Sequence, residues 1–381
     1  MKSTSFYILG ALLLLVSCKE PFIPELEPTE KSFLVVEGYI NLGQGAVTTV
    51  KLSRTLPLQD PEAQQPETGA TLTIEEEGAN AGFTMQEQTA GVYVSEPLKL
   101  EAGKNYRVKI KTKNGKIYAS TYETGKATPA IDEVIWKWEK DGIRIYVNSH
   151  DPLNNTRYYH WTFEDVWQIQ SVEKSYFRYE NGKMIERTPL ETEQMFTCWG
   201  YGKSSDLLLG STAGLSQDTI SFPVTAFGHH TSRTKIKYSI EVTQHALSQQ
   251  EFFFLQGMKK NTSEMGGFFD PQPSEALGNI QNLADSNEIV VGYLGAYSTQ
   301  KKRLFIRKED LPEFPTKDKC NGTYSPDHPD SLQVAFGSGA FLPTSKITGE
   351  IENVPFTMFL GLQAICVDCR IFGKSEKPSY W

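Results

Sequence analysis

The sequence has no dense run of lysine and arginine that could neutralise a line of phosphates. Its 38 basic residues are outnumbered by 46 acidic ones, and the net charge of −8 is spread along all 381 residues. Nucleic acid is therefore not an expected partner, because nucleic-acid binding depends on phosphate contacts. The sequence also lacks a repeat with a period of 20–50 residues, so neither a propeller nor a helical solenoid is supported.

Long apolar runs are also missing. The run near the start, Phe6–Val16, is well short of the ~20 residues that a membrane-spanning helix needs. It follows a basic end at Lys2 and leads into Leu15–Cys18, a small-residue stretch that ends in cysteine. This order is typical of a bacterial lipoprotein signal. We therefore expect residues 1–18 to be a signal segment, with cleavage before Cys18 and acylation of that cysteine as the membrane anchor.

Residues 19–31 contain many prolines and glutamates and too few apolar residues to pack. They are typical of a tether between an anchor and a folded body. Lys19 and Glu20 partly match the short charged motif that directs Bacteroidota lipoproteins to the cell exterior, although Pro21 stands where a second acid is expected. We expect an outer-membrane lipoprotein and favour exposure at the cell surface. The sequence alone does not decide which face of the membrane the protein occupies.

From Ser32 the pattern changes to short β-branched and aromatic runs separated by glycine, asparagine or proline, which is the signature of strands and turns. Apolar and polar residues alternate cleanly in Tyr106–Ile110, and Asn114-Gly115 is a strong hairpin signal. We predict a mainly β protein with an N-terminal Ig-like or transthyretin-like β-sandwich over residues 32–128.

Residues 129–381 are predicted to form a larger β-rich domain with few helices. Its strands include Glu288–Tyr297, which is expected to be continuous. One helix is expected after Ser248, because Ser248–Glu251 fits a capping box. Since the three residues Phe252–Phe254 cannot share one helical face, this helix should be buried on several sides.

Four cysteines remain after Cys18, namely Cys198, Cys320, Cys366 and Cys369. In an exported protein this even number predicts two disulfides, with three possible pairings that the sequence cannot distinguish. The short spacing of Cys366 and Cys369 also fits a zinc knuckle or a redox pair. Zinc would need a second close pair or nearby histidines, and a redox motif would open a helix after a strand. Structural disulfides are therefore favoured over either alternative.

No catalytic arrangement is visible in the sequence. Ser149, His150 and His160 could supply a nucleophile and a base, yet no serine has the Gly-x-Ser-x-Gly surroundings of a nucleophile elbow. His229 and His230 are adjacent, so in a strand their side chains would point to opposite faces. We expect a protein that is not an enzyme and that uses neither a metal nor a cofactor.

Several stretches of the chain resemble one known family. They are the lipobox, Phe33–Gly38, Val50–Thr55, Tyr238–Gln244, Gly266–Pro273, Gly278–Ile280, Cys366–Arg370 and the final Trp381. Together they resemble the Bacteroidota outer-membrane lipoproteins catalogued as domain of unknown function 4249. This resemblance implies no assigned activity and no catalytic residues. It also implies an association with TonB-dependent outer-membrane receptors, beside which such proteins are often encoded.

The expected function is therefore that of a non-enzymatic accessory of a TonB-dependent β-barrel receptor in nutrient uptake, with an unknown cargo. We expect partner contact in the irregular segment between Gly266 and Gly278, through Phe268, Phe269, Gln272 and Glu275, because long loops on a rigid scaffold often carry recognition. The alternative for this segment is a phenylalanine plug over the core.

Aromatic residues are dense between Trp136 and Trp167. If exposed, they would support a second function, that of a freestanding glycan-binding or adhesive surface lipoprotein. Core packing is favoured for most of them, because inward-facing strand positions must be filled first.

Overall fold

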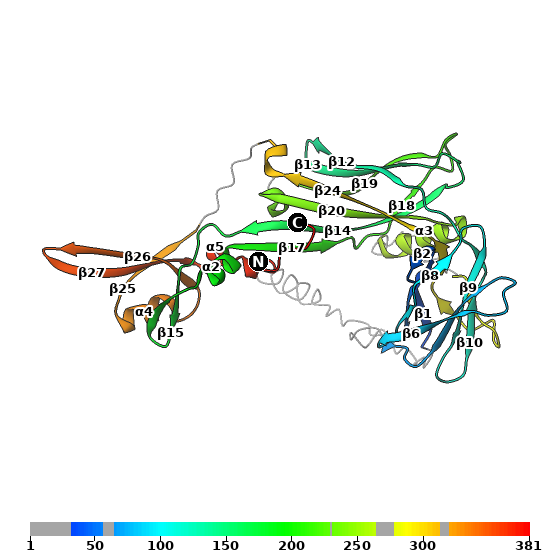
Figure 1. Ribbon diagram of the computed structural model, residues 1–381, viewed down its shortest axis with the longest axis horizontal. Coiled ribbons are helices and arrows are strands. Elements are labelled where there is room, and N and C mark those ends of the chain that lie inside the picture. Colours follow the sequence, from blue (N-terminus) through cyan, green and yellow to red (C-terminus); the bar gives the residue numbers. More distant parts are fainter. Residues whose placement is uncertain (1–31, 56–64, 229–230, 264–277, 313–319) are drawn as a thin grey trace, which may run out of the picture.

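The structure is a computed structural model that describes residues 32–55, 65–228, 231–263, 278–312 and 320–381. Strands make up 53% and helices 13%, which confirms the mainly β prediction. The molecule is elongated, with a sandwich at one end, a second sandwich in the middle and a long hairpin at the other end (Figure 1). Within the described ranges, no helix is long and apolar enough to cross a membrane.

The N-terminal sandwich is built from short antiparallel strands. They are β1 (Leu34–Asn41), β2 (Gly43–Ala46), β3 (Thr49–Arg54), β4 (Gln65–Pro66), β5 (Thr71–Glu76), β6 (Phe83–Thr89), β7 (Val92–Ser95), β8 (Leu98–Leu100), β9 (Asn105–Lys111), β10 (Ile117–Ser120) and β11 (Glu123–Thr124). The alternation predicted for Tyr106–Ile110 is confirmed, because Tyr106, Val108 and Ile110 are all fully buried in the core of this sandwich.

Three strands from much later in the chain complete this sheet. They are β21 (Ile280–Asn282), β22 (Val290–Val291) and β23 (Gly295–Tyr297). β21 pairs with β10, while β22 and β23 run parallel to β1. The sandwich therefore extends beyond the predicted range 32–128. The prediction of one continuous strand over Glu288–Tyr297 is wrong, because β22 and β23 are separate strands. The chain leaves the strand conformation at Gly292, whose φ of 137° is favourable only for glycine.

The central sandwich has two facing sheets. One contains β12 (Ile131–Glu139), β13 (Gly142–His150) and β19 (Thr219–Phe227); the other contains β14 (Tyr158–Gln170), β17 (Thr197–Lys203), β18 (Leu208–Ser211), β20 (Lys237–Ala246) and β24 (Thr299–Arg307). Trp161 is fully buried between them and stacks on Phe222 at a centroid distance of 4.4 Å. Trp136, Trp138 and Trp167 pack against this core, so core packing is confirmed as their role.

Helix α3 (Gln249–Ser263) lies where the two sandwiches meet (Figure 1). Its predicted start is confirmed, because the Ser248 hydroxyl accepts a hydrogen bond from the Glu251 amide at 3.1 Å. The Glu251 carboxyl turns inward and does not complete the capping box. Phe252 and Phe254 are buried whereas Phe253 is 52% exposed, so this helix is buried on two sides and open on a third.

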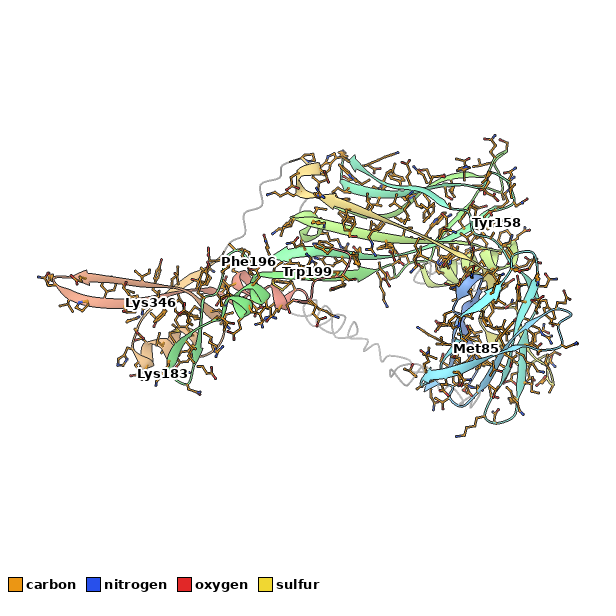
Figure 2. The ribbon with its side chains drawn as sticks, in the orientation of Figure 1. Met85, Tyr158, Lys183, Phe196, Trp199 and Lys346 are labelled. Atoms are coloured by element: carbon orange, nitrogen blue, oxygen red, sulfur yellow. A yellow bond between two sulfur atoms is a disulfide. The ribbon has the colours of Figure 1, made fainter. Side chains whose placement is uncertain are left out.

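The remaining elements form a distal lobe. They are β15 (Phe177–Glu180), β16 (Lys183–Glu186), α2 (Pro189–Phe196), β25 (Gly322–Pro326), α4 (Pro329–Phe336), β26 (Phe341–Ile351), β27 (Val354–Gln363) and α5 (Ala364–Val367). Three short 3₁₀ helices complete the list of elements: η2 (Ser232–Thr234), η3 (Lys308–Asp310) and η4 (Cys369–Ile371). Lys183 and Lys346 mark this lobe in Figure 2, at the opposite end from Met85 of the N-terminal sandwich.

Candidate functional site

Two disulfides fasten the end of the chain to the body of the protein. Cys198 of β17 pairs with Cys369 across 171 residues, and Cys320 pairs with Cys366 across 46 residues. The prediction of two structural bridges is confirmed, and the structure supplies the pairing that the sequence left open. The CxxC residues therefore bond to two different partners and not to each other. Among the described residues, no group of three or more His, Cys, Asp or Glu side chains is placed so that it could hold a metal ion.

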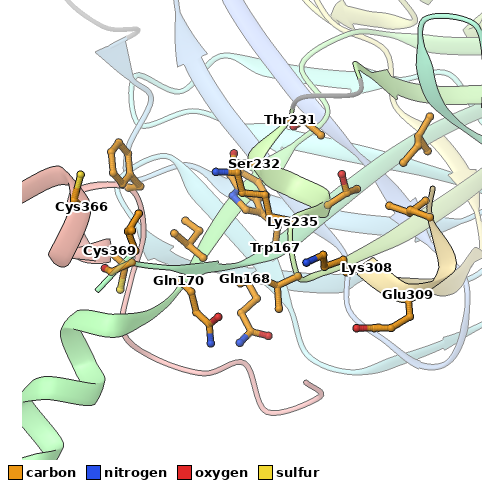
Figure 3. A pocket seen from close by; sticks show the side chains of 18 of the residues that line it. Trp167, Gln168, Gln170, Thr231, Ser232, Lys235, Lys308, Glu309, Cys366 and Cys369 are labelled. Atoms are coloured by element: carbon orange, nitrogen blue, oxygen red, sulfur yellow. The ribbon is translucent and has the colours of Figure 1, made fainter. Parts of the chain in front are cut away.

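A cleft of about 1060 Å³ opens beside these disulfides at the end of the central sandwich. We call it the terminal cleft. Figure 3 shows Cys366 and Cys369 at one end of it and Lys308 and Glu309 at the other. Its lining mixes apolar with polar side chains and includes Trp138, Trp167, Gln168, Gln170, Lys235 and Phe372. Clefts of this size and mixture are typical of binding sites.

An ion pair with a buried carboxylate lies behind Trp167, one of the residues that line the terminal cleft. Asp165 of β14 is 1% exposed and lies 3.2 Å from the Arg233 guanidinium, and the Tyr238 hydroxyl donates to it at 3.1 Å. Burial raises the pKa of Asp165, and Arg233 opposes this shift. The Arg233 guanidinium also covers the Trp167 ring at 4.8 Å, while Gly200 lies against that ring. Trp167 is thus held in place and does not offer an open stacking face.

A second candidate surface is the hairpin of β26 and β27, which projects from the distal lobe (Figure 1). The register pairs Ile347 with Met358 and Ile351 with Val354. With Phe356, which lies across Gly349, these four residues form an apolar row on one face. Ile347 is 41% exposed, and Ile351 and Val354 are each 65% exposed. We call this row, Ile347, Ile351, Val354, Phe356 and Met358, the hairpin stripe.

A third group of interest lies where the two sandwiches meet and is partly to fully buried. This seam cluster contains Tyr39, His160, His245, Glu251 and Tyr297. His245 packs against the rings of Tyr39, His160 and Tyr297 at centroid distances of 5.2, 5.7 and 5.3 Å, and the Tyr297 hydroxyl donates to Glu251 at 3.2 Å. Burial lowers the pKa of His245 to about 3 and of His160 to about 4. Both imidazoles are therefore neutral near pH 7.

The possible Ser–His arrangement is not assembled in the structure. The Ser149 hydroxyl bonds to Gln244 and to the Ala130 carbonyl, at 2.9 and 3.0 Å. His150 instead lies 2.8 Å from Asp132. His160 belongs to the seam cluster. These three residues thus have separate structural roles.

Several predicted site residues lie outside the described residues. They are Cys18, His229, His230, Phe268, Phe269, Gln272 and Glu275. Acylation of Cys18 and partner contact by the loop stay predictions. The sequence analysis missed the hairpin stripe and the terminal cleft. Two-residue alternation in Ile347–Ile351 and Val354–Met358 could have revealed the stripe, whereas the cleft depends on long-range disulfide pairing.

Two of the solved structures that match this chain are similar to it only remotely. A marsupial T cell receptor matches at 7% identity over 87% of this chain and 92% of its own, with a TM-score of 0.18. Chitinase ChiA74 from Bacillus thuringiensis matches at 10% identity over 53% of this chain and 28% of its own, with a TM-score of 0.14. No curated protein matches the chain. The family model for the domain of unknown function DUF4249 matches residues 19–303, and the chain belongs to that family.

Proposed function

We propose that this chain is a lipid-anchored outer-membrane protein that acts as a non-enzymatic accessory of a TonB-dependent receptor in nutrient uptake. Family membership supports the receptor association, and the signal ending at Cys18 supports the anchor. Two proteins held in one membrane gain effective concentration, so a modest interface between them can persist.

The observation that carries this proposal is the hairpin stripe. A two-stranded ribbon with water on both sides needs no apolar face, yet Ile351 and Val354 each remain 65% exposed. Thr348 and Thr357, which pair on the opposite face, are polar. Because contiguous exposed apolar surface marks interaction sites, the stripe is suited to burial against a partner.

The composition of the stripe favours a protein partner over a glycan. Sugars are commonly bound by open aromatic faces, whereas the stripe is mainly aliphatic and the Phe356 ring lies across Gly349. The stripe also lies at the opposite end of the molecule from the N-terminal sandwich with its strand β1 (Figure 1).

The test is recovery of the receptor from cells. A tagged full-length chain is crosslinked in the outer membrane of its own host and solubilised, and the co-purifying proteins are identified. Ile351→Asp should reduce recovery of a β-barrel receptor by roughly tenfold or more, since tenfold corresponds to only about 1.4 kcal/mol and a buried charge costs more. Thr348→Asp adds the same charge to the polar face and should leave recovery unchanged.

The contrary result is recovery of no β-barrel protein together with tight binding to a purified surface polysaccharide. That result would favour a freestanding adhesive or glycan-binding lipoprotein.

A further inference from the structure

We infer that the free edge of β26 binds the same edge of a second copy of this chain, so that two hairpins form one four-stranded antiparallel sheet about a twofold axis at Thr348. This pairing uses the edge of the strand, whereas the proposed receptor contact uses the face that bears the hairpin stripe. The inference therefore goes beyond the proposed function and does not depend on it.

The outer part of β26 is an exposed sheet edge. Within the part of the chain that the structure describes, β26 pairs with no strand except β27, and Lys346, Thr348 and Glu350 are exposed. Nearer the lobe the edge is already bonded, because the Tyr176 amide donates to the Thr344 carbonyl at 3.3 Å. The open edge thus runs from Lys346 to the hairpin tip, which projects beyond the rest of the lobe (Figure 1).

The backbone groups of three residues point out of this open edge. Thr357 stands opposite Thr348, and its carbonyl accepts a hydrogen bond from the Asp327 amide, so its backbone groups face away from β26. Opposed residues of an antiparallel pair either bond to each other or both face outward. Thr348 therefore faces outward, and so do its alternate neighbours Lys346 and Glu350.

The other edge of the hairpin is unsuited to pairing. β25 covers β27 as far as the Pro326–Met358 position, and Asp327 uses the next outward carbonyl. The following outward residue of β27 is Pro355, which has no amide to donate. Proline on an edge strand discourages pairing with other strands. The open edge of β26 contains no proline, so it is the edge that is left to pair.

The charges on this edge indicate a second copy as the partner. Lys346 and Glu350 lie at equal distances on either side of Thr348. The residues opposite these two charges on β27 are Phe359 and Pro355, so the neighbouring strand offers no charge to complement them. When two β26 edges pair with Thr348 opposite Thr348, Lys346 of each copy stands opposite Glu350 of the other. Opposite charges in directly opposed positions stabilise a strand pair, and a twofold interface requires a surface that is complementary to itself.

Other registers are less favourable. Sliding one strand by four residues would place Lys346 opposite Lys346 or Glu350 opposite Glu350. Sliding it by two would leave an outward residue opposite the turn or opposite Thr344, whose carbonyl already accepts a hydrogen bond. In the register centred on Thr348, three opposed pairs exchange two bonds each, which gives about six backbone hydrogen bonds.

This arrangement also joins the two hairpin stripes. Residues that stand opposite each other in an antiparallel pair direct their side chains to the same face of the sheet. The stripes of both copies would therefore lie on one face and form a single, wider apolar surface.

The test traps the pair in solution through one new cysteine. The mature chain with Cys18→Ala has no free thiol, because its other four cysteines are bridged. In this background Thr348→Cys brings two thiols together at the axis, where opposed residues have Cα atoms about 5.5 Å apart, as a disulfide requires. Mild oxidation should produce a disulfide-linked dimer on non-reducing electrophoresis. Thr357→Cys, one strand further from the axis, is the matched control and should stay monomeric.

Charge exchange tests the register. In the Thr348→Cys background, either Lys346→Glu or Glu350→Lys alone sets like charges opposite each other at both symmetric positions. Each should lower the initial rate of trapping by roughly tenfold. A mixture of the two variants should restore the rate and give a mixed dimer, because each lysine then meets a glutamate across the axis. Circular dichroism checks that every variant is folded.

Three results would overturn the inference. They are the absence of a dimer with Thr348→Cys, equally fast trapping of Thr357→Cys, and a mixture of the charge variants that is trapped no faster than either variant alone. None of these results depends on receptor recovery, so the inference and the proposed function can fail separately.

Discussion

Replacing Glu251 by glutamine should alter how stability depends on pH. Glu251 projects from α3 into the seam cluster and is 4% exposed. Oε2, one of its carboxyl oxygens, has no hydrogen-bond partner in the described structure, and Gly295 lies against it. Burial raises the pKa of Glu251 from about 4.5 to about 8, with nearby Glu123 adding to the shift and with Tyr297 and Lys126 opposing it.

The sign of the effect follows from the raised pKa. Below pH 4.5 the carboxyl is protonated in both the folded and the unfolded chain, so it costs nothing. Between pH 4.5 and pH 8 the unfolded chain ionises first, and the free energy of unfolding falls. At about 1.4 kcal/mol per pKa unit, the shift of the pKa from 4.5 to about 8 lowers the free energy of unfolding by on the order of 5 kcal/mol, and this loss is complete above pH 8. Glutamine keeps the shape of the protonated group and cannot ionise, so Glu251→Gln should lack this loss.

Urea unfolding at pH 5 and pH 8.5 tests this expectation. All six tryptophans lie after residue 129, so their fluorescence reports the central sandwich and the segments attached to it. Glu251→Gln should be close to the parent at pH 5 and more stable by several kcal/mol at pH 8.5. Glu164→Gln, at an exposed position on β14, is the control and should follow the parent. The same stability difference between Glu251→Gln and the parent at both pH values would refute the reasoning.

Three further changes have expected outcomes. Cys18→Ala should move the protein out of the membrane fraction or block its processing, and normal fractionation would contradict the predicted anchor. The double change Cys198→Ser/Cys369→Ser should lower the free energy of unfolding by roughly 2–5 kcal/mol in urea titrations, and no change would show that this bridge is not structural. Gly292→Ala should destabilise the N-terminal sandwich by about 1–3 kcal/mol, because the added Cβ would clash with the Val36 carbonyl oxygen. Hydrogen exchange in β1 that is the same as in the parent would contradict this expectation.

Local patterns predicted local structure well. Asn114-Gly115 does turn the chain between β9 and β10, with Gly115 at a φ of 88°. Ser248 does begin α3. These features depend on only a few neighbouring residues, so a single sequence carries them.

Pairing between strands and between cysteines that are far apart in the chain was harder to predict from the sequence. β21 and β22 contain three and two residues, too few for a periodic signal, and they are recognisable only through pairing with β10 and β1. The disulfide pairing likewise depends on where residue 198 and the C-terminal segment meet. The terminal cleft follows from that meeting, which is why the sequence did not predict it.

Residue-specific crosslinking is the most direct test of the proposal that the hairpin stripe binds a receptor. A photo-crosslinking amino acid placed at Val354, in the hairpin stripe, should capture a TonB-dependent β-barrel receptor in intact cells. The same group at Thr357, on the opposite face of the hairpin, should capture much less of it. Equal capture from both positions, or capture of no barrel from Val354, would contradict the proposal that the hairpin stripe docks this lipoprotein on a receptor.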